Sequence, residues 1–232
     1  MKKERFVRLG AATLLAGGTL WAGSAVAVSF STPDGVSGTP STQTTGGASR
    51  SGGSCSPAEV AEGETIALLP AHETVFTSMA RPTIYVYVPP MTAAEATFSI
   101  QDENHETPIA FEVDLPADGG IVPIAVPDSA PELEAGKTYK WLFEVGCYGQ
   151  YDPNNPIVEG TVTRKESAPI AVPDEAIARA EAYSEAGYWY ETLAALAEAR
   201  QLQPEDDRIA EGWNELLASV GLEDLADENF AD

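Results

Sequence analysis

The side chains that could act as nucleophiles or general bases in this chain are few. Hydrolysis needs a nucleophile beside a base and an orienting group, yet the sequence has no Gly-x-Ser-x-Gly motif, and its only histidines, His72 and His105, lie in polar, turn-like stretches. Acidic residues are abundant, which allows many carboxylate pairs and singles out none. We therefore expect no catalytic residue and no enzyme activity. The alternative is a carbohydrate-active or cell-wall-modifying enzyme that uses a carboxylate pair on its β-strands.

Two cysteines, Cys55 and Cys147, are the only residues for sulfur chemistry. Two cysteines in an exported chain predict one disulfide, because that compartment is oxidising. The bridge would close a loop of about 90 residues and add about 4 kcal/mol of stability. Two free thiols, or a mixed disulfide with a partner, are the alternatives.

No cofactor or metal is expected. The histidines do not flank the cysteines at the spacing of zinc ligands. Two oxygen-rich loops, 102–104 and 152–155, could hold Ca²⁺, but neither follows the twelve-residue calcium-loop pattern. Asp and Asn in turns bond their own backbone, which explains both loops without an ion.

Aromatic residues give the best indication of a binding surface. Tyr148 and Tyr151 follow Cys147 in a loop, and Tyr188, Trp189 and Tyr190 are consecutive at a predicted helix junction. Consecutive residues of a helix cannot all face one core, so at least one of the three is expected at the surface, where it could anchor a partner. The alternative is that they seal the helices against the strands.

Residues 1–27 have the pattern of an export signal peptide. A basic start is followed by an apolar run, Leu9 to Ala22, and by Ala25-Val26-Ala27 as a cleavage site, with Val28 as the first mature residue. The run is short for a membrane span, although a retained anchor is the alternative. We expect an extracytoplasmic protein, periplasmic or secreted through a Sec-type signal, with no stable membrane insertion after cleavage.

Charge excludes one class of partner. Residues 1–27 hold four basic residues and one acidic residue, so the other 205 residues carry 9 Lys+Arg and 35 Asp+Glu, a net charge of −26. Nucleic-acid phosphates need cationic contacts, so nucleic-acid binding is not expected. A basic partner is compatible with this charge, as is simple solubility.

The rest of the chain divides by composition and periodicity. Residues 28–63 are rich in Ser, Thr and Gly and are expected to form a disordered leader. Residues 64–168 contain seven short runs with strand-like alternation and no helix between them, which predicts an antiparallel β-sandwich. Within it, Leu133, Gly136 and Tyr139 have the spacing of the corner where immunoglobulin-like and fibronectin-type sandwiches enter a late strand and the tyrosine hydroxyl bonds upstream backbone.

Residues 169–225 change to helical periodicity, with three helices that stop near Gly187, before Pro204 and at Gly221. The acidic tail 226–232 is expected to fray. The helical stretch resembles a single tetratricopeptide repeat, although Thr192 stands where an Ala is usual. The residues that carry this resemblance are Ala180, Tyr183, Gly187, Tyr188 or Trp189, Ala199 and Pro204. Because such repeats are stable only when stacked, the unit must pack on the sandwich, on another copy or on a partner.

As a whole, the chain resembles the DUF928 family of exported cyanobacterial proteins of unknown function, over about Cys55 to Leu225. The motifs that carry the resemblance are Arg81-Pro82-Thr83, Tyr87-Val88-Pro89, Phe98 with Gln101-Asp102, Leu133 with Gly136-Lys137-x-Tyr139-x-Trp141, Cys147, Glu159-Gly160, Ala186 to Tyr190 with Leu193-Ala194-x-Leu196-Ala197, Trp213, Leu216-Leu217 and Val220-Gly221-Leu222. The resemblance implies a cyanobacterial cell envelope, and it offers no catalytic residues that could be carried over to this chain.

Together these patterns predict an α+β protein, an immunoglobulin/fibronectin-like β-sandwich followed by a three-helix tetratricopeptide-like unit. The expected function is non-catalytic: binding or scaffolding in the cell envelope, with a partner protein held through the helical unit. This expectation rests on module types that usually bind. The oligomeric state stays open.

Overall fold

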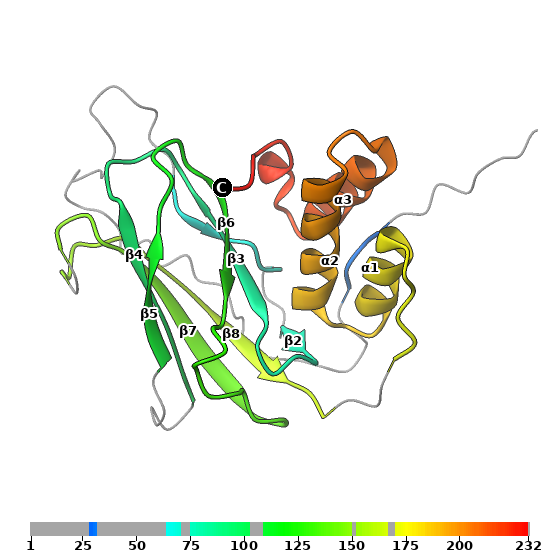
Figure 1. The fold of residues 1–232 in the computed structure, drawn as a ribbon, viewed down its shortest axis with the longest axis horizontal. Helices are drawn as coiled ribbons and strands as arrows, with labels where there is room; N and C mark the ends of the chain where they lie inside the picture. Colours follow the sequence, from blue (N-terminus) through cyan, green and yellow to red (C-terminus); the bar gives the residue numbers. More distant parts are fainter. Residues whose placement is uncertain are drawn as a thin grey trace, which may run out of the picture.

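The computed structural model describes residues 28–31, 64–70, 75–102, 109–149, 152–166 and 170–231. These residues form two β-sheets and three α-helices (Figure 1). The elements are β1 (Ile66–Ala67), β2 (Phe76–Thr77), β3 (Thr83–Val88), β4 (Glu95–Asp102), β5 (Ile109–Asp114), β6 (Gly120–Ala125), β7 (Thr138–Val145), β8 (Ile157–Arg164), α1 (Ala176–Glu185), α2 (Trp189–Leu202), α3 (Asp207–Ser219) and the short 3₁₀ helix η1 (Glu223–Leu225). None of the helices in the described ranges is long and apolar enough to cross a membrane.

The strands form a three-stranded sheet in the order β1-β3-β6 and a five-stranded sheet in the order β2-β8-β7-β4-β5. All neighbours are antiparallel except β2 and β8, which run parallel. Alternate residues of the long strands are buried, as in Phe98 and Ile100 of β4 and Trp141 and Phe143 of β7. This alternation confirms the predicted period of two, and both sheets contribute their buried side chains to one hydrophobic core.

The corner before β7 has the predicted local geometry. The Tyr139 hydroxyl accepts a hydrogen bond of 2.8 Å from the backbone N–H of Glu134, five residues upstream. Leu133 is buried, and Gly136 has a φ of +80°, a conformation that glycine adopts without a Cβ clash. The hydroxyl therefore fixes the turn that leads into the most apolar strand.

Gly160 in β8 allows the two sheets to approach closely. It faces Trp141 of β7 across the strand pair. A Cβ added at Gly160 would lie 2.5 Å from Cζ2 of Trp141 and 2.5 Å from Cδ1 of Leu69, which follows β1. These distances are shorter than a van der Waals contact, so the Trp141 ring lies where a side chain at position 160 would be.

The helices end where the sequence predicts. α1 is capped by Glu175, whose Oε2 accepts from the N–H of Ala178, and α3 is capped by Asp206. Gly187 and Gly221 follow α1 and α3 with φ of +76° and +78°, as expected for glycines that end helices. We call residues 176–225, from α1 to η1, the helical unit, and residues 64–166 the β unit.

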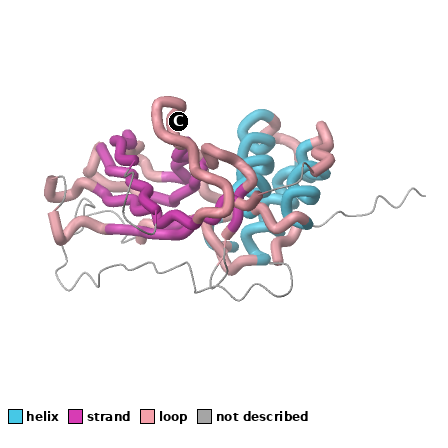
Figure 2. The backbone as a smooth tube through the Cα atoms, turned by 90° about the horizontal axis from the view of Figure 1, so that it is seen from below, coloured by secondary structure: helices cyan, strands magenta, loops and turns pink. Residues whose placement is uncertain are grey.

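The helical unit packs against the β unit through α2, which contacts β2 and β3. Figures 1 and 2 show the three helices grouped on one side of the molecule and the strands on the other. Leu193, Leu196 and Trp213 of the helical unit belong to the same hydrophobic core as the strands. The two units therefore share one core.

The ends of the described chain differ from the prediction. Val28 and Phe30, which fall in the predicted leader, are buried, so the expectation of disorder is wrong for residues 28–31. Residues 1–27 and 32–63, the predicted signal peptide and the remainder of the leader, lie outside the described residues.

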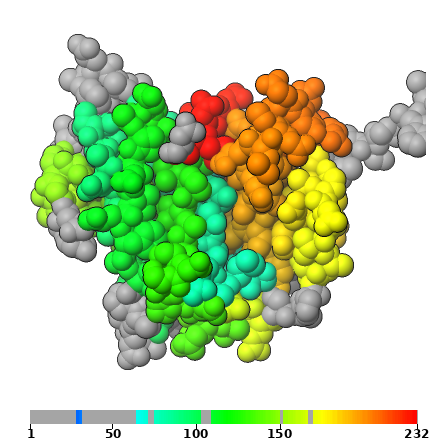
Figure 3. Space-filling view, viewed as in Figure 1, coloured from blue at the N-terminus to red at the C-terminus, as the bar shows by residue number. Residues whose placement is uncertain are grey.

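The acidic tail is also not frayed up to Ala231. Ile121 of β6 donates from its N–H to the carbonyl of Asn229 at 2.8 Å and accepts from the N–H of Ala231 at 2.9 Å. The ring of Phe230 packs between Tyr85 of β3 and Trp213 of α3, and Figure 3 shows these C-terminal residues in red between the strands and the helices. The prediction considered only the charge of the tail and missed its one large apolar side chain.

Candidate functional site

The beginning of α2 connects the helical unit to both sheets through buried hydrogen bonds. Nε1 of Trp189 donates to the carbonyl of Leu68 at 2.9 Å, next to β1. The hydroxyl of Tyr190 accepts from Nε1 of Trp141 at 3.1 Å and donates to the carbonyl of Thr161 at 3.0 Å. Burial raises the pKa of Tyr190 above its usual value, so this hydroxyl stays protonated and can donate.

The expectation that at least one aromatic residue of this junction is exposed is wrong. Tyr188, Trp189 and Tyr190 are 6%, 0% and 2% exposed. The prediction assumed one core on one side of the helix, but α2 has buried neighbours on several sides. The ring of Trp189 packs edge-to-face on that of Phe30, with 5.0 Å between the ring centroids. Tyr190 instead forms its hydrogen bond with Trp141 of the five-stranded sheet.

The other predicted aromatic residues lie elsewhere. Tyr148 is 47% exposed in the loop after β7, and Tyr151 lies outside the described residues. The structure therefore does not bring Tyr148 together with the three junction aromatics in one surface. Of the whole set, Tyr148 is the described member that is available to a partner.

Glu191, which the sequence analysis did not single out, is the most unusual polar residue of the junction. It is 6% exposed. Its Oε1 lies within hydrogen-bonding distance of four donors: Oγ1 of Thr77 at 3.0 Å, the N–H and hydroxyl of Ser78 at 2.6 and 2.7 Å, and the N–H of Met79 at 3.1 Å. One carboxylate oxygen thus holds the loop that follows β2.

The second oxygen of Glu191, Oε2, is buried and has no hydrogen-bond partner. A buried carboxylate oxygen without a partner is costly, so the Glu191 side chain is a candidate for a functional role. The side chain lines a pocket that lies beside it.

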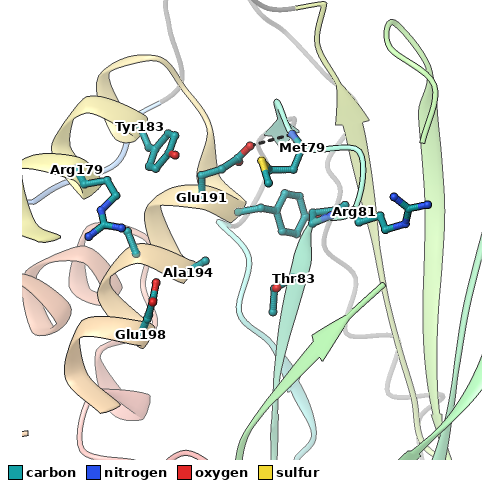
Figure 4. Close-up of a pocket in the computed structure, with 11 residues that line it drawn as sticks. Met79, Arg81, Thr83, Arg179, Tyr183, Glu191, Ala194 and Glu198 are labelled. Carbon is teal, nitrogen blue, oxygen red and sulfur yellow. Dashed lines mark hydrogen bonds between the residues drawn. The ribbon is translucent and has the colours of Figure 1, made fainter. Parts of the chain in front are cut away.

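This pocket, which we call the junction pocket, has a volume of about 230 Å³ and lies between α1, α2 and the start of β3 (Figure 4). Its wall is mostly apolar, with Met79, Tyr183 and Ala194 among its members. Glu191 and Glu198 lie on the same helix, seven residues apart. Arg179 of α1 faces them from the other wall, as Figure 4 shows.

The two arginines of the junction pocket differ in what they offer. The guanidinium of Arg81 points away from the pocket (Figure 4) and pairs with Glu132 at 2.8 Å, so only its stem lines the wall. Arg179 donates through one terminal nitrogen to the carbonyl of Asp174 at 3.0 Å, and its Nε has no partner. Arg179 is therefore the cation that a bound group would meet.

The negative charge of Glu198, which lines the pocket, also affects the ionisation of a tyrosine in β3. Burial, and to a smaller extent the carboxylate of Glu198, raises the pKa of Tyr85 from 10 to about 12. The residues that line the pocket include no serine, cysteine or histidine. The arrangement combines an apolar wall with separate acidic and basic groups, which suits binding of an amphipathic side chain.

Comparison with known proteins identifies the family. The family model described as Domain of Unknown Function (DUF928) matches residues 45–230. The chain belongs to the DUF928 family. No curated protein and no solved structure matches it. The family model confirms the resemblance to DUF928, and its description names no activity.

The other predicted sites of this DUF928 chain lie away from the junction pocket. Cys147 is half-buried after β7, and Cys55 lies outside the described residues, so the predicted disulfide stays a prediction. His72 and His105 also lie outside the described residues. In the described part of the chain, no group of three His, Cys, Asp or Glu residues could hold a metal ion.

The oxygen-rich loop 152–155 uses its side chains within the turn. Oδ1 of Asp152 accepts from the N–H of Asn154 at 2.9 Å. The amide of Asn155 donates to Glu144 and to the carbonyl of Gly149, and its oxygen accepts from the N–H of Tyr148. These contacts are the turn chemistry that the sequence predicts.

The enzymatic alternative rests on carboxylate pairs of the five-stranded sheet. Thr97 of β4 faces Glu112 of β5 on one side and Glu144 of β7 on the other. Strands lie about 4.8 Å apart, so the backbones that carry these two acids are about 10 Å apart on one face. A catalytic role for this pair stays the alternative prediction.

Proposed function

We propose that this DUF928 chain is a non-catalytic binding or scaffolding protein of the cell envelope, which holds a partner protein at the junction pocket. The observation that carries the proposal is the buried carboxylate of Glu191 at the wall of this pocket, with one oxygen fully bonded and the other without a partner. As the sequence suggests, the proposed contact with the partner protein involves the helical unit. The partner would bind at the junction pocket and not to exposed aromatic residues.

The chemistry of the pocket favours a partner segment with a basic side chain. Met79, 51% exposed at the pocket, and Tyr183 would cover the aliphatic stem of such a side chain. Glu191 and Glu198 would face its charge, and Arg179 would meet a carbonyl or carboxylate of the same segment. The net charge of −26 after residues 1–27 adds a general attraction for a basic partner.

Two finer assignments of the fold belong to the same proposal. We infer a fibronectin-type sandwich, which the strand order of the two sheets and the Tyr139 hydrogen bond support. We infer a tetratricopeptide-like helical unit, which the buried small residues Ala180 and Ala199 and the turn at Gly187 support.

The envelope location and the disulfide rest on the sequence. The pattern of residues 1–27 supports export, and the family resemblance suggests a cyanobacterial source. The chain has two cysteines, Cys55 and Cys147, and two cysteines in an exported chain favour one bridge. An oxidising compartment would keep that bridge.

The test is in-cell crosslinking and mass spectrometry of the envelope fraction with a pocket-filling variant. Ala194→Trp would place a large side chain in the junction pocket, whereas Ala218→Trp adds the same side chain on the exposed face of α3. A partner that crosslinks to the wild-type chain and to Ala218→Trp, but not to Ala194→Trp, would support the proposal. A partner retained by Ala194→Trp would contradict it.

A further inference from the structure

Residues 28–31, which we call the N-terminal segment, lie in a groove of the helical unit. We call this the helical groove; Ser184 of α1, Trp189 of α2, and Gly212 and Ser219 of α3 contact the segment there. Figure 1 shows the segment in dark blue beside the helices. Val28 and Phe30 are 1% and 5% exposed, while Ser29 and Ser31 face outwards.

The groove recognises the segment in the manner of an extended peptide. The hydroxyl of Ser219 accepts from the N–H of Phe30 at 3.1 Å, and the hydroxyl of Ser184 donates to the carbonyl of Ser29 at 2.5 Å. Both bonds go to main-chain atoms, and the two alternate side chains fill the groove. Main-chain bonds together with alternate side-chain pockets are the means by which extended peptides are bound.

Every one of these contacts is made with the helical unit, and the connection to the rest of the chain is long. Ser31 and Glu64, the next described residue, are 33 residues apart. A connection of this length can span up to about 110 Å. If cleavage occurs before Val28, as the sequence predicts, the segment is also the free end of the mature chain and can leave the groove without threading.

We propose that the helical groove also takes the N-terminal segment of a second copy, so that copies of this chain join by exchanging residues 28–31. The exchanged contact is identical to the one within the chain, so no new interface has to be built. The contact within one chain is intramolecular, so competition by the chain's own segment keeps exchange low in dilute solution. Copies held close together in the envelope would exchange. This inference does not depend on the junction pocket.

The experiment uses two full mature chains that complement each other. The acceptor carries Val28→Ala and Phe30→Ala, which weakens its own segment and leaves its groove open. The donor carries Gly212→Leu: a Cβ at position 212 would already lie 3.5 Å from Cγ2 of Val28, so the larger side chain occupies the place of Val28. Circular dichroism verifies that both variants fold.

We expect a mixture of the two to form a one-to-one dimer in sedimentation equilibrium below 1 mM, whereas neither variant dimerises alone. Adding Phe30→Ala to the donor should weaken the dimer at least tenfold. No dimer up to 1 mM, or a dimer that is indifferent to Phe30→Ala, would overturn the proposal.

If the donor does not fold, a synthetic peptide of residues 28–36 takes its place, and Trp189 fluorescence of the acceptor reports binding, because Phe30 contacts that ring. Saturable binding that is lost with Phe30→Ala in the peptide supports exchange, and its absence at 1 mM overturns it. A foreign peptide that binds the acceptor while this peptide does not would likewise overturn it.

Discussion

Replacing Glu191 should weaken the attachment of the helical unit to the β unit more than any change at an exposed acid of α2. In Glu191→Ala the N–H groups of Ser78 and Met79 lose their carboxylate acceptor. The N–H of Met79 keeps a second acceptor, Oγ1 of Thr77. The N–H of Ser78 would therefore be the backbone donor most affected by the loss of the carboxylate. A fully buried donor left without a partner costs about 1–3 kcal/mol. These two donors are only partly buried, and relief of the buried charge of Glu191 offsets part of the cost.

We therefore expect Glu191→Ala to lower the free energy of unfolding by about 2 kcal/mol. Glu191→Gln keeps an acceptor oxygen at the same place but loses the charge, so its cost should be smaller, about 1 kcal/mol. Urea titration of the full chain, followed by tryptophan fluorescence and by far-UV circular dichroism, measures both values.

The matched control is Glu198→Ala, one exposed acid on the same helix, which should change stability by less than about 0.5 kcal/mol. A Glu191→Ala variant as stable as this control would show that the 77–79 loop does not depend on the carboxylate. A Gln variant less stable than the Ala variant would show the same, because the amide oxygen of Gln can still accept from that loop.

Three further changes test the packing of the β unit and its response to pH. Gly160→Ala should lower the free energy of unfolding by about 2 kcal/mol in urea titration, because its Cβ would meet Trp141 and Leu69 at 2.5 Å; unchanged stability would mean that the sheets are not so close. Tyr139→Phe should cost about 1 kcal/mol and lower the melting temperature, since the bond to the N–H of Glu134 is lost; an unchanged melting temperature would count against that corner. Burial raises the pKa of Tyr85 to about 12, so between pH 10 and 12 the unfolded chain loses this proton while the folded chain keeps it. Tyr85 by itself should lower the stability over that window by about 1.4 kcal/mol per pH unit, and Tyr85→Phe should make the fall in melting temperature less steep; an equally steep fall in that variant would exclude Tyr85 as a cause.

Local periodicity predicted the elements well, because each strand and helix buries side chains at a regular interval. The alternation of Phe98 and Ile100, and of Trp141 and Phe143, comes from strands with one buried face. Gly187 and Gly221 marked two helix ends because a positive φ is easy only for glycine.

The junction could not be predicted from such patterns, because it depends on contacts between distant residues. The donors to Glu191 lie 112 to 114 residues upstream, and an acid on a helix is normally a surface residue. The burial of Trp189 and Tyr190 together requires neighbours on two sides of α2, which come from the N-terminal segment and from the five-stranded sheet. Val28-Ser29-Phe30 is too short to stand out in a Ser/Thr-rich stretch.

The most direct test of the proposed function is site-specific photo-crosslinking in intact cells from two positions. One photoreactive residue replaces Met79, which lines the junction pocket, and the other replaces Tyr148, an exposed aromatic residue in the loop after β7. We expect a defined protein adduct from position 79 that is lost with Ala194→Trp, and no such adduct from position 148. An adduct from position 148 alone would contradict the proposed function and place the partner on the β unit.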